Sequence, residues 1–530
     1  MRRQNNVTRA ASGRPIAMGG WRLSSCCHTP ESLVTLFRFL LYILPLALCF
    51  SYFPVISLGE NETMNFELSL PLIWLVLFDI LSLVMICKKY RKQLFSKVFG
   101  SILWWLFPLF ATLSICWSLN PLRGFLTVGV VWLLFFAVIS FWELRENLDT
   151  GFWKVFFRWF FGSALLVCIW CVIQCILDVS GVFQEASLLC DGCVYQMFGF
   201  PHPNGFAIEP QFMGNLLIAP IMVVAADFCQ FSGCVARSHR HGARALILVL
   251  PHSGIPRTWQ KLSPLLFFVF SVTLFLTFSR GAIYATVVGL IFLFSFAVVR
   301  AKKSDVKKVF LNTLKTLGVF ILSFVFALNL QVVFSAVSPT TDTYADGVAK
   351  VLNHLSLGVI DIRGGESEEP EGSSEPVENL SEPVENSGEE AVFDGYVAES
   401  TDTRVRLFNA ALDIWRKDFK TAAVGVGLGG AGQALYNNGF SPAPKEIVQN
   451  EYASLLLETG VIGVSLFILI VVMAVRVAFK NRMTAGLVLA LMIAYAITLV
   501  FFSGLVNALQ IVMMPALFIM MGWEKKRDEA

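Results

Sequence analysis

The stretch LSPLLFFVFSVTLFLTFSRGAIYATVVGLIFLFSFAVV, residues 262–299, decides the fold. It contains two apolar blocks, with Ser279 and Arg280 lying between them. Each block is close to the roughly 20 residues that a helix needs to cross the hydrocarbon layer of a membrane. Because a helix satisfies its own backbone hydrogen bonds in lipid, the stretch predicts two membrane-spanning helices that meet at a polar corner.

Similar apolar blocks recur along the chain, of which 56% of the residues are hydrophobic and 15% are charged. Soluble domains contain about 25% charged residues, so this composition excludes an ordinary soluble protein. We expect an all-α polytopic membrane protein with about twelve transmembrane helices, helices 1–9 within residues 34–336 and helices 10–12 within residues 453–522. The predicted spans are 34–56, 68–87, 98–116, 124–142, 159–177, 207–228, 262–279, 281–299, 309–336, 453–475, 484–502 and 503–522.

Lysine and arginine indicate the orientation, because they are enriched in cytoplasmic connections. With the N-terminus inside, the predicted inside segments carry 29 of the 41 lysines and arginines. Residues 1–33 and 523–530 are then cytoplasmic tails. The first apolar block is too long for the core of a cleavable signal, so we expect it to remain as a span.

A large extracytoplasmic loop, residues 337–452, separates predicted helices 9 and 10. Its middle part, residues 364–400, is acidic and contains the hexapeptide SEPVEN twice. Such a composition cannot bury enough apolar surface to fold, so we expect this part to be disordered.

Residues 402–452 are expected to fold against the membrane face. Leu407, Ala411 and Ile414 recur at helical spacing and predict a helix with one apolar side. Asp402 or Thr403 is the expected N-cap of this helix. The glycine-rich run GVGLGG at 425–430 then allows tight turns.

Cys190 and Cys193 fall in another predicted external loop, in the sequence CDGC. Either a disulfide bond or no bond is consistent with this pair in an oxidising compartment. A metal site would require two more ligands, and none lies nearby in the sequence. We expect no bound metal, no cofactor and no nucleic-acid partner.

Arg280 is the most informative single residue, because arginine is unusual at the outer end of a span. It either fixes the depth of the helix by snorkelling or binds a phosphate group in bidentate fashion. Arg404 and Arg406 on the loop helix either pair with the acidic insertion or close over the same phosphate. Glu209 is a carboxylate at membrane depth, where ionisable groups are costly and usually functional or paired.

Four motifs follow one another between residues 263 and 475. FSRGA at 278–282 begins a span, and Arg-x3-Phe-x2-Ala at 404–411 precedes GVGLG at 425–429. QNEYASLLLETGVIG at 449–463 leads into the next span. This combination resembles the O-antigen ligase/polymerase family.

The resemblance implies a metal-independent glycosyltransferase of the bacterial cytoplasmic membrane, whose donor is a glycan on undecaprenyl diphosphate. It implies catalytic roles for Arg280 and Arg404. Family ligases carry a histidine at the position of Gln449, and an amide cannot serve as a general base, so Glu451 and Glu209 are the candidate proton acceptors. The candidate substrate-binding residues are Ser279, Arg406, Gln449, Asn450 and Tyr452.

The absent histidine favours a polymerase of lipid-linked repeat units in surface polysaccharide assembly, because family polymerases are more divergent. The alternatives are a ligase that transfers finished glycan to an acceptor, a transporter of lipid-linked oligosaccharide, and a non-catalytic scaffold. The expected partners are the lipid-linked donor, a glycan acceptor, membrane lipids and a chain-length regulator.

Overall fold

The computed structural model describes most of the apolar segments and the second half of the long loop. The described residues are 31–51, 55–61, 64–90, 102–180, 202–207, 209–230, 257–301, 303, 305–337, 348–349, 352, 355, 389–481, 484–504 and 508–521. The N-terminal tail, the acidic hexapeptides, the C-terminal tail and the predicted Cys190–Cys193 pair lie outside these residues.

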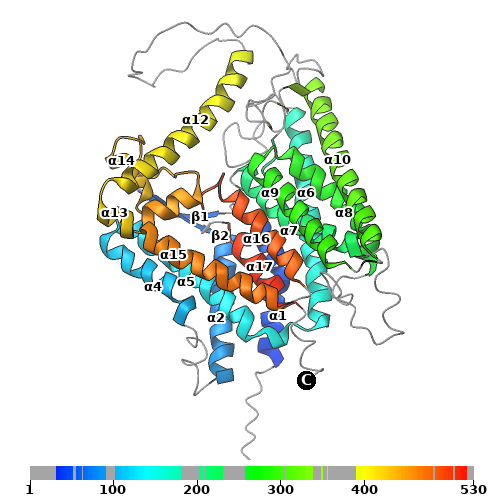
Figure 1. Ribbon diagram of the computed structural model, residues 1–530, viewed down its shortest axis with the longest axis horizontal. Coiled ribbons are helices and arrows are strands. Elements are labelled where there is room, and N and C mark those ends of the chain that lie inside the picture. The colour runs from blue at the N-terminus through cyan, green and yellow to red at the C-terminus, as the bar shows by residue number, and fades with distance from the viewer. Residues whose placement is uncertain are drawn as a thin grey trace, which may run out of the picture.

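Each of the twelve predicted spans corresponds to a helix, which confirms the all-α polytopic class (Figure 1). Eight helices in the described part are long and apolar enough to cross a membrane. They are α1 Glu31–Cys49, α2 Leu70–Tyr90, α5 Pro121–Glu143, α6 Thr150–Val179, α7 Pro210–Gln230, α9 Arg280–Arg300, α10 Val306–Val337 and α15 Glu451–Lys480.

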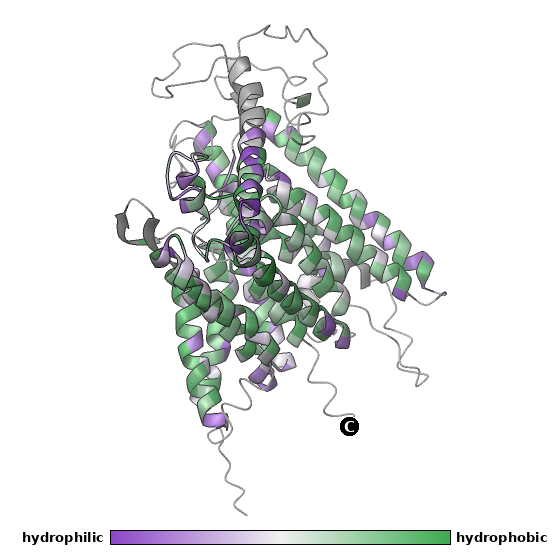
Figure 2. Cartoon of the chain, turned by 60° about the vertical axis from the view of Figure 1, so that its left-hand side comes forward, coloured by the Kyte–Doolittle hydropathy of each residue, from purple (hydrophilic) through white to green (hydrophobic). Residues whose placement is uncertain are grey.

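Four further helices contain shorter apolar stretches, which in α8 cover Lys261–Leu276. They are α4 Leu106–Ser114, α8 Arg257–Leu276, α16 Ala485–Thr498 and α17 Gln510–Met520. Short 3-10 helices occupy η1 Ile102–Trp104, η2 Ile115–Trp117 and η3 Arg145–Asn147. Figure 2 shows that hydrophobic residues cover the bundle, whereas hydrophilic residues concentrate on α12 and at helix ends.

A β-hairpin between α1 and α2 was not predicted. Strand β1 Val55–Asn61 pairs antiparallel with β2 Met64–Ser69, and α1 ends at Cys49 rather than near residue 56. Hydropathy assigned Val55 and Ile56 to the first span because both are apolar. Strand pairing, rather than helix formation, satisfies their backbone.

The starts of α5 and α6 carry local capping residues. Asn120 accepts a hydrogen bond from the Arg123 amide at 3.2 Å, and Pro121 begins α5. Asp149 caps α6 by accepting from the Phe152 amide at 2.7 Å, and it also pairs with Arg38 of α1 at 2.8 Å. These contacts satisfy amides that have no partner inside the helix and that lipid cannot satisfy.

Aromatic rings fill the centre of the bundle. The rings of Phe156, Phe157 and Phe160 on α6 all contact Phe518 of α17, with centroids 5.9–6.4 Å apart. Lipid is as apolar as these side chains, so close packing rather than exclusion of water favours their association.

The folded half of the long loop forms a small apolar core of its own against α15. This outer-loop core is built by α12 Glu389–Arg416, α14 Ala431–Asn437 and the start of α15, together with Val426 and Val448. The short helix α13 Phe419–Val424 follows α12 and contributes no buried residue to it. The predicted apolar side of the loop helix is confirmed, because Leu407, Ala411 and Ile414 are buried in this core. The predicted N-cap is wrong: α12 begins at Glu389 and runs through Asp402 and Thr403. The start of α12 therefore lies within the part that we expected to be disordered.

The glycine motifs are explained by backbone packed directly on backbone. Gly427 has φ +89°, and a Cβ there would lie 2.3 Å from Ser118 Cα. Gly460 has φ +62° at a kink in α15, and a Cβ there would lie 2.4 Å from the carbonyl carbon of Ala423. GVGLGG therefore packs on Ser118 ahead of α5, and ETGVIG packs on the end of α13, while the Gly427 amide donates to the Glu458 carbonyl of α15 at 2.9 Å.

Alanine at Gly427 or Gly460 should destabilise the protein. A left-handed residue costs about 1–2 kcal/mol when it carries a Cβ, and displaced backbone at these positions adds to this cost. Gly439→Ala is the matched control, because Gly439 has φ +75° but a Cβ there would meet nothing within 4 Å. Thermal unfolding midpoints of detergent-purified variants measure the difference. Equal losses in all three variants would contradict the packing explanation.

Candidate functional site

Arg280 is buried where three parts of the chain meet. It is the first residue of α9, and 7% of its surface is exposed. The hydroxyl of the preceding Ser279 donates a hydrogen bond to Gln211 of α7 at 2.6 Å. A Cβ on Gly281 would lie 2.7 Å from Gln211 Nε2 and 2.9 Å from Phe501 Cβ. Arg280 therefore lies at the junction of α7, α9 and the turn after α16.

The predicted motif at the start of α15 fastens this helix to the same turn. Asn450 caps α15 by accepting from the Ala453 amide at 3.0 Å and donates to the Val500 carbonyl at 2.9 Å. The Tyr452 hydroxyl donates to the Ala496 carbonyl at 2.7 Å. Asn450 and Tyr452 thus have structural contacts that fix the position of α15.

Glu451 makes two contacts with the turn between α16 and α17. Its amide donates to the Leu499 carbonyl at 2.9 Å, and its carboxylate accepts from the Gly504 amide at 2.7 Å. A carboxylate held in this way is oriented toward backbone of its own chain. It is therefore less suited to accept a proton from a substrate than an exposed carboxylate that accepts no such bond.

Arg404 approaches this junction from α12. Its Nε donates to Gln449 Oε1 at 2.9 Å, which gives Gln449 a defined partner. Arg404 also acts electrostatically on Glu209, which is exposed just before α7. Arg406 is exposed on α12, and no contact of the described residues joins it to this cluster.

Glu209 is exposed just before α7, but surrounding protein removes part of the water around its carboxylate. This desolvation raises the pKa of Glu209 above its ordinary value, and the positive charge of Arg404 lowers it in part. The carboxylate therefore combines accessibility with an increased affinity for a proton.

Contacts at the turn after α16 link the neighbours of Arg280 with the partner of Arg404. Gly281, next to Arg280, approaches Phe501, and the neighbouring Val500 accepts from Asn450. Asn450 follows Gln449, the partner of Arg404. The start of α9 and the Gln449–Arg404 pair are thus held against the same turn.

Two residues of this region have a strained backbone conformation. Phe278 has φ +48° and Gln449 has φ +55°, the two non-glycine residues with positive φ in the described part. Such conformations cost about 1–3 kcal/mol each and persist where the surroundings hold them, often at functional sites. One strained residue lies two positions before Arg280, and the other is bonded to Arg404.

Glu458 of α15 accepts hydrogen bonds from the glycine run and the residue after it. Its Oε1 accepts from the Ala431 amide at 3.2 Å, and its carbonyl accepts from the Gly427 amide at 2.9 Å. Arg123 of α5 is close enough to act on its charge. Glu458 is therefore explained by the fold of the outer loop.

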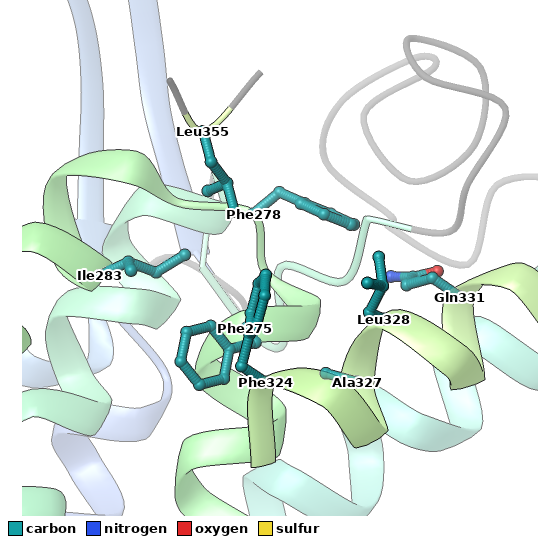
Figure 3. Close-up of a pocket in the computed structure, with 8 residues that line it drawn as sticks. All are labelled: Phe275, Phe278, Ile283, Phe324, Ala327, Leu328, Gln331 and Leu355. Atoms are coloured by element: carbon teal, nitrogen blue, oxygen red, sulfur yellow. The ribbon is translucent and has the colours of Figure 1, made fainter. Parts of the chain in front are cut away.

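A narrow apolar pocket lies beside the start of α9 (Figure 3). Its empty volume is about 240 Å³, including the open mouth. Phe278, the strained residue, forms one wall. The other lining residues are Phe275, Ile283, Phe324, Ala327, Leu328, Gln331 and Leu355.

Sequence reasoning missed His202 and Gln211 as members of this region. The His202 ring is stacked on the Phe278 ring, with centroids 5.6 Å apart. His202 was visible in the polar run HPNG, but an isolated histidine in a loop gives no indication of its neighbours. No described group of His, Cys, Asp and Glu residues has the arrangement of a metal site.

Fold and site together define a polytopic helical membrane protein with an arginine-containing polar junction at one end of its bundle. Residues 265–468 match a family model described as O-antigen ligase. This match over residues 265–468 confirms the resemblance seen in the motifs. A comparison with curated proteins found no match.

The matched region includes Arg280, Arg404 and Gln449, whereas Glu209 and the turn after α16 lie outside it. Its family indicates a function of the O-antigen ligase or polymerase type, carried out by a membrane-embedded glycosyltransferase-like protein. Part of the candidate site is therefore supplied by flanking helices.

Removal of the Glu451 carboxylate should loosen the turn after α16. Glu451→Ala leaves the Gly504 amide without its acceptor, and a hydrogen bond to a charged group contributes about 1.5–3 kcal/mol. We expect faster hydrogen–deuterium exchange at Gly504, and less acceleration in Glu451→Gln, which retains an acceptor oxygen. Arg406→Ala is the control and should leave this exchange unchanged. Unaltered exchange in Glu451→Ala would contradict the anchoring role.

Proposed function

We propose that the protein polymerises undecaprenyl-diphosphate-linked repeat units during assembly of a surface polysaccharide. The observation that supports this most directly is that the start of α9, with Arg280, and the Gln449 partner of Arg404 are both held against the turn after α16. The family assignment supports glycan transfer in general, and the pair of arginines supports a donor that carries a diphosphate.

Arg280 is suited to the diphosphate for two reasons. Its guanidinium stays charged and presents a planar set of donors that matches phosphate oxygens. It also begins a helix of 21 residues, and the N-terminus of a helix favours an anion. Arg404 supplies a second positive charge from the outer loop, while Gln449 orients its side chain.

The chemistry is a displacement at the anomeric carbon of the donor sugar. The acceptor hydroxyl oxygen forms a bond to this carbon, and the bond between the carbon and the diphosphate oxygen breaks with its electron pair. Undecaprenyl diphosphate leaves, and the two arginines stabilise the negative charge that develops on it. The hydroxyl proton passes to a general base.

Glu209 is the better of the two predicted bases. Its carboxylate is exposed just before α7, within electrostatic reach of Arg404, and desolvation raises its pKa. Glu451, in contrast, already accepts a backbone hydrogen bond from Gly504. Gln449 cannot accept the proton and acts as a partner of Arg404.

The apolar pocket beside Phe278 supports a lipid-linked donor. Its wall begins two residues from Arg280, and Figure 3 shows aromatic and aliphatic side chains around it. We place the first isoprene unit of the carrier against these apolar side chains at the open mouth of the pocket, with the diphosphate at the arginines. We place the reaction at the outer face of the bacterial cytoplasmic membrane, with both chain termini in the cytoplasm and a chain-length regulator as a further partner.

Replacement of Arg280 should prevent polymer formation. Arg280→Ala is expected to lower kcat/KM by about 10²–10³, the usual effect of removing one group that stabilises transition-state charge. Arg280→Lys should retain only part of the activity, because lysine keeps the charge and loses the bidentate geometry. Transfer from a purified lipid-diphosphate donor is the measurement.

The intermediates that accumulate in cells carrying Arg280→Ala separate the alternatives. Loss of a polymerase leaves single repeat units on the lipid carrier, whereas loss of a ligase leaves long chains on it. Normal polymer in this variant, with normal amounts of membrane-inserted protein, would remove Arg280 from the mechanism. A purified protein that moves lipid-linked glycan without forming a glycosidic bond would favour the transporter.

The pH dependence of transfer tests Glu209. A general base must be ionised, so activity should fall as the pH decreases through the raised pKa of this carboxyl, above the ordinary value of 4.5. Glu209→Gln should lose most activity and this acid limb. Arg404→Ala removes the charge that lowers the pKa, so the acid limb of its residual activity should move to higher pH. An unchanged profile in Glu209→Gln would assign the proton to another group.

A further inference from the structure

His202 lies on a rigid segment that leads into α7. Pro203, Asn204 and Gly205, which follow it, are buried. Gln174 of α6 locks this segment: its amide nitrogen donates to Asn204 Oδ1 and to the Gly205 carbonyl, both at 3.1 Å, and its oxygen accepts from the Gly205 amide at 2.9 Å. The position of His202 is therefore set by α6.

This segment and α7 each contact the turn before Arg280. The His202 ring is stacked on Phe278, with an interplanar angle of 22°, and Gln211 accepts a hydrogen bond from Ser279. Phe278 and Ser279 are the two residues that precede Arg280. These two contacts hold the two residues that precede the arginine.

The turn needs such support because Phe278 has φ +48°. A bulky residue in this region of conformational space is an outlier that its neighbours must hold in place. A stacked pair of rings stabilises the positions of both side chains beyond the effect of burial alone. The Nε2 atom of His202 is buried, which orients one side of the imidazole toward the protein.

We infer that His202 is a positioning residue for Arg280, which it orients by stacking its imidazole ring on Phe278. It acts through the ring face rather than through proton transfer. This inference rests on the proposed function in one respect, namely that Arg280 binds the diphosphate of the donor.

Binding of undecaprenyl diphosphate to the purified full-length protein in lipid nanodiscs tests the inference. His202→Ala should weaken binding by about two- to tenfold, the range that one aromatic contact contributes. His202→Phe keeps a stacking ring without an ionisable nitrogen and should restore most of the affinity. The pH dependence of binding should be the same in His202→Phe and in the wild type.

Two further variants make the result specific. Phe278→Leu removes the other ring of the pair and should weaken binding to the same extent as His202→Ala, and the double variant should lose no more than either single variant. Trp170→Leu is the matched control, because Trp170 stacks on Phe206 of the same segment, with centroids 5.5 Å apart, rather than on Phe278. It should leave diphosphate affinity unchanged.

Each other outcome overturns the inference. Equal losses in His202→Phe and His202→Ala would assign the role to the imidazole nitrogens, and equal losses in Trp170→Leu and His202→Ala would indicate general loosening of the segment. Wild-type affinity in His202→Ala would show that the stack does not position Arg280. If the wild-type protein fails to bind undecaprenyl diphosphate, the proposed function fails as well, so the two failures are distinguishable.

Discussion

The hydrogen-bonded joint between the start of α15 and the turn after α16 holds the candidate site together. Glu451 bonds this turn through its amide and its carboxylate, and Asn450 bonds it through its side chain. Helix ends and turns at a membrane surface leave amides and carbonyls that lipid cannot satisfy. The joint satisfies them with protein groups, and it thereby fixes Gln449 and, through Gln449, Arg404.

Strain and close packing have complementary roles around this joint. The positive φ of Phe278, two residues before Arg280, and of Gln449, the partner of Arg404, costs free energy. Backbone contacts at Gly427 and Gly460, which a Cβ would prevent, supply a rigid frame that can hold such conformations. A frame of this kind keeps charged groups in position before the substrate arrives, which is the requirement for electrostatic catalysis.

The family-matched region and the candidate site do not coincide. The match covers residues 265–468 and contains both arginines, whereas Glu209, Gln211 and the turn after α16 come from flanking helices. Arg280 lies beside this turn only because α7 and α16 pack against α9. A matched segment can thus carry the charged groups while the rest of the bundle orients them.

The sequence by itself determined the twelve apolar segments, the apolar side of the loop helix and the two arginines, because hydropathy, helical spacing and short motifs are local properties. Only the tertiary structure decided that Glu451 is bonded to Gly504, that Arg404 lies near Glu209, and that His202 stacks on Phe278. It also decided that Val55–Ser69 forms a hairpin and that α12 begins at Glu389. These features depend on contacts between residues far apart in the chain, and no local sequence pattern predicts which helix ends will meet.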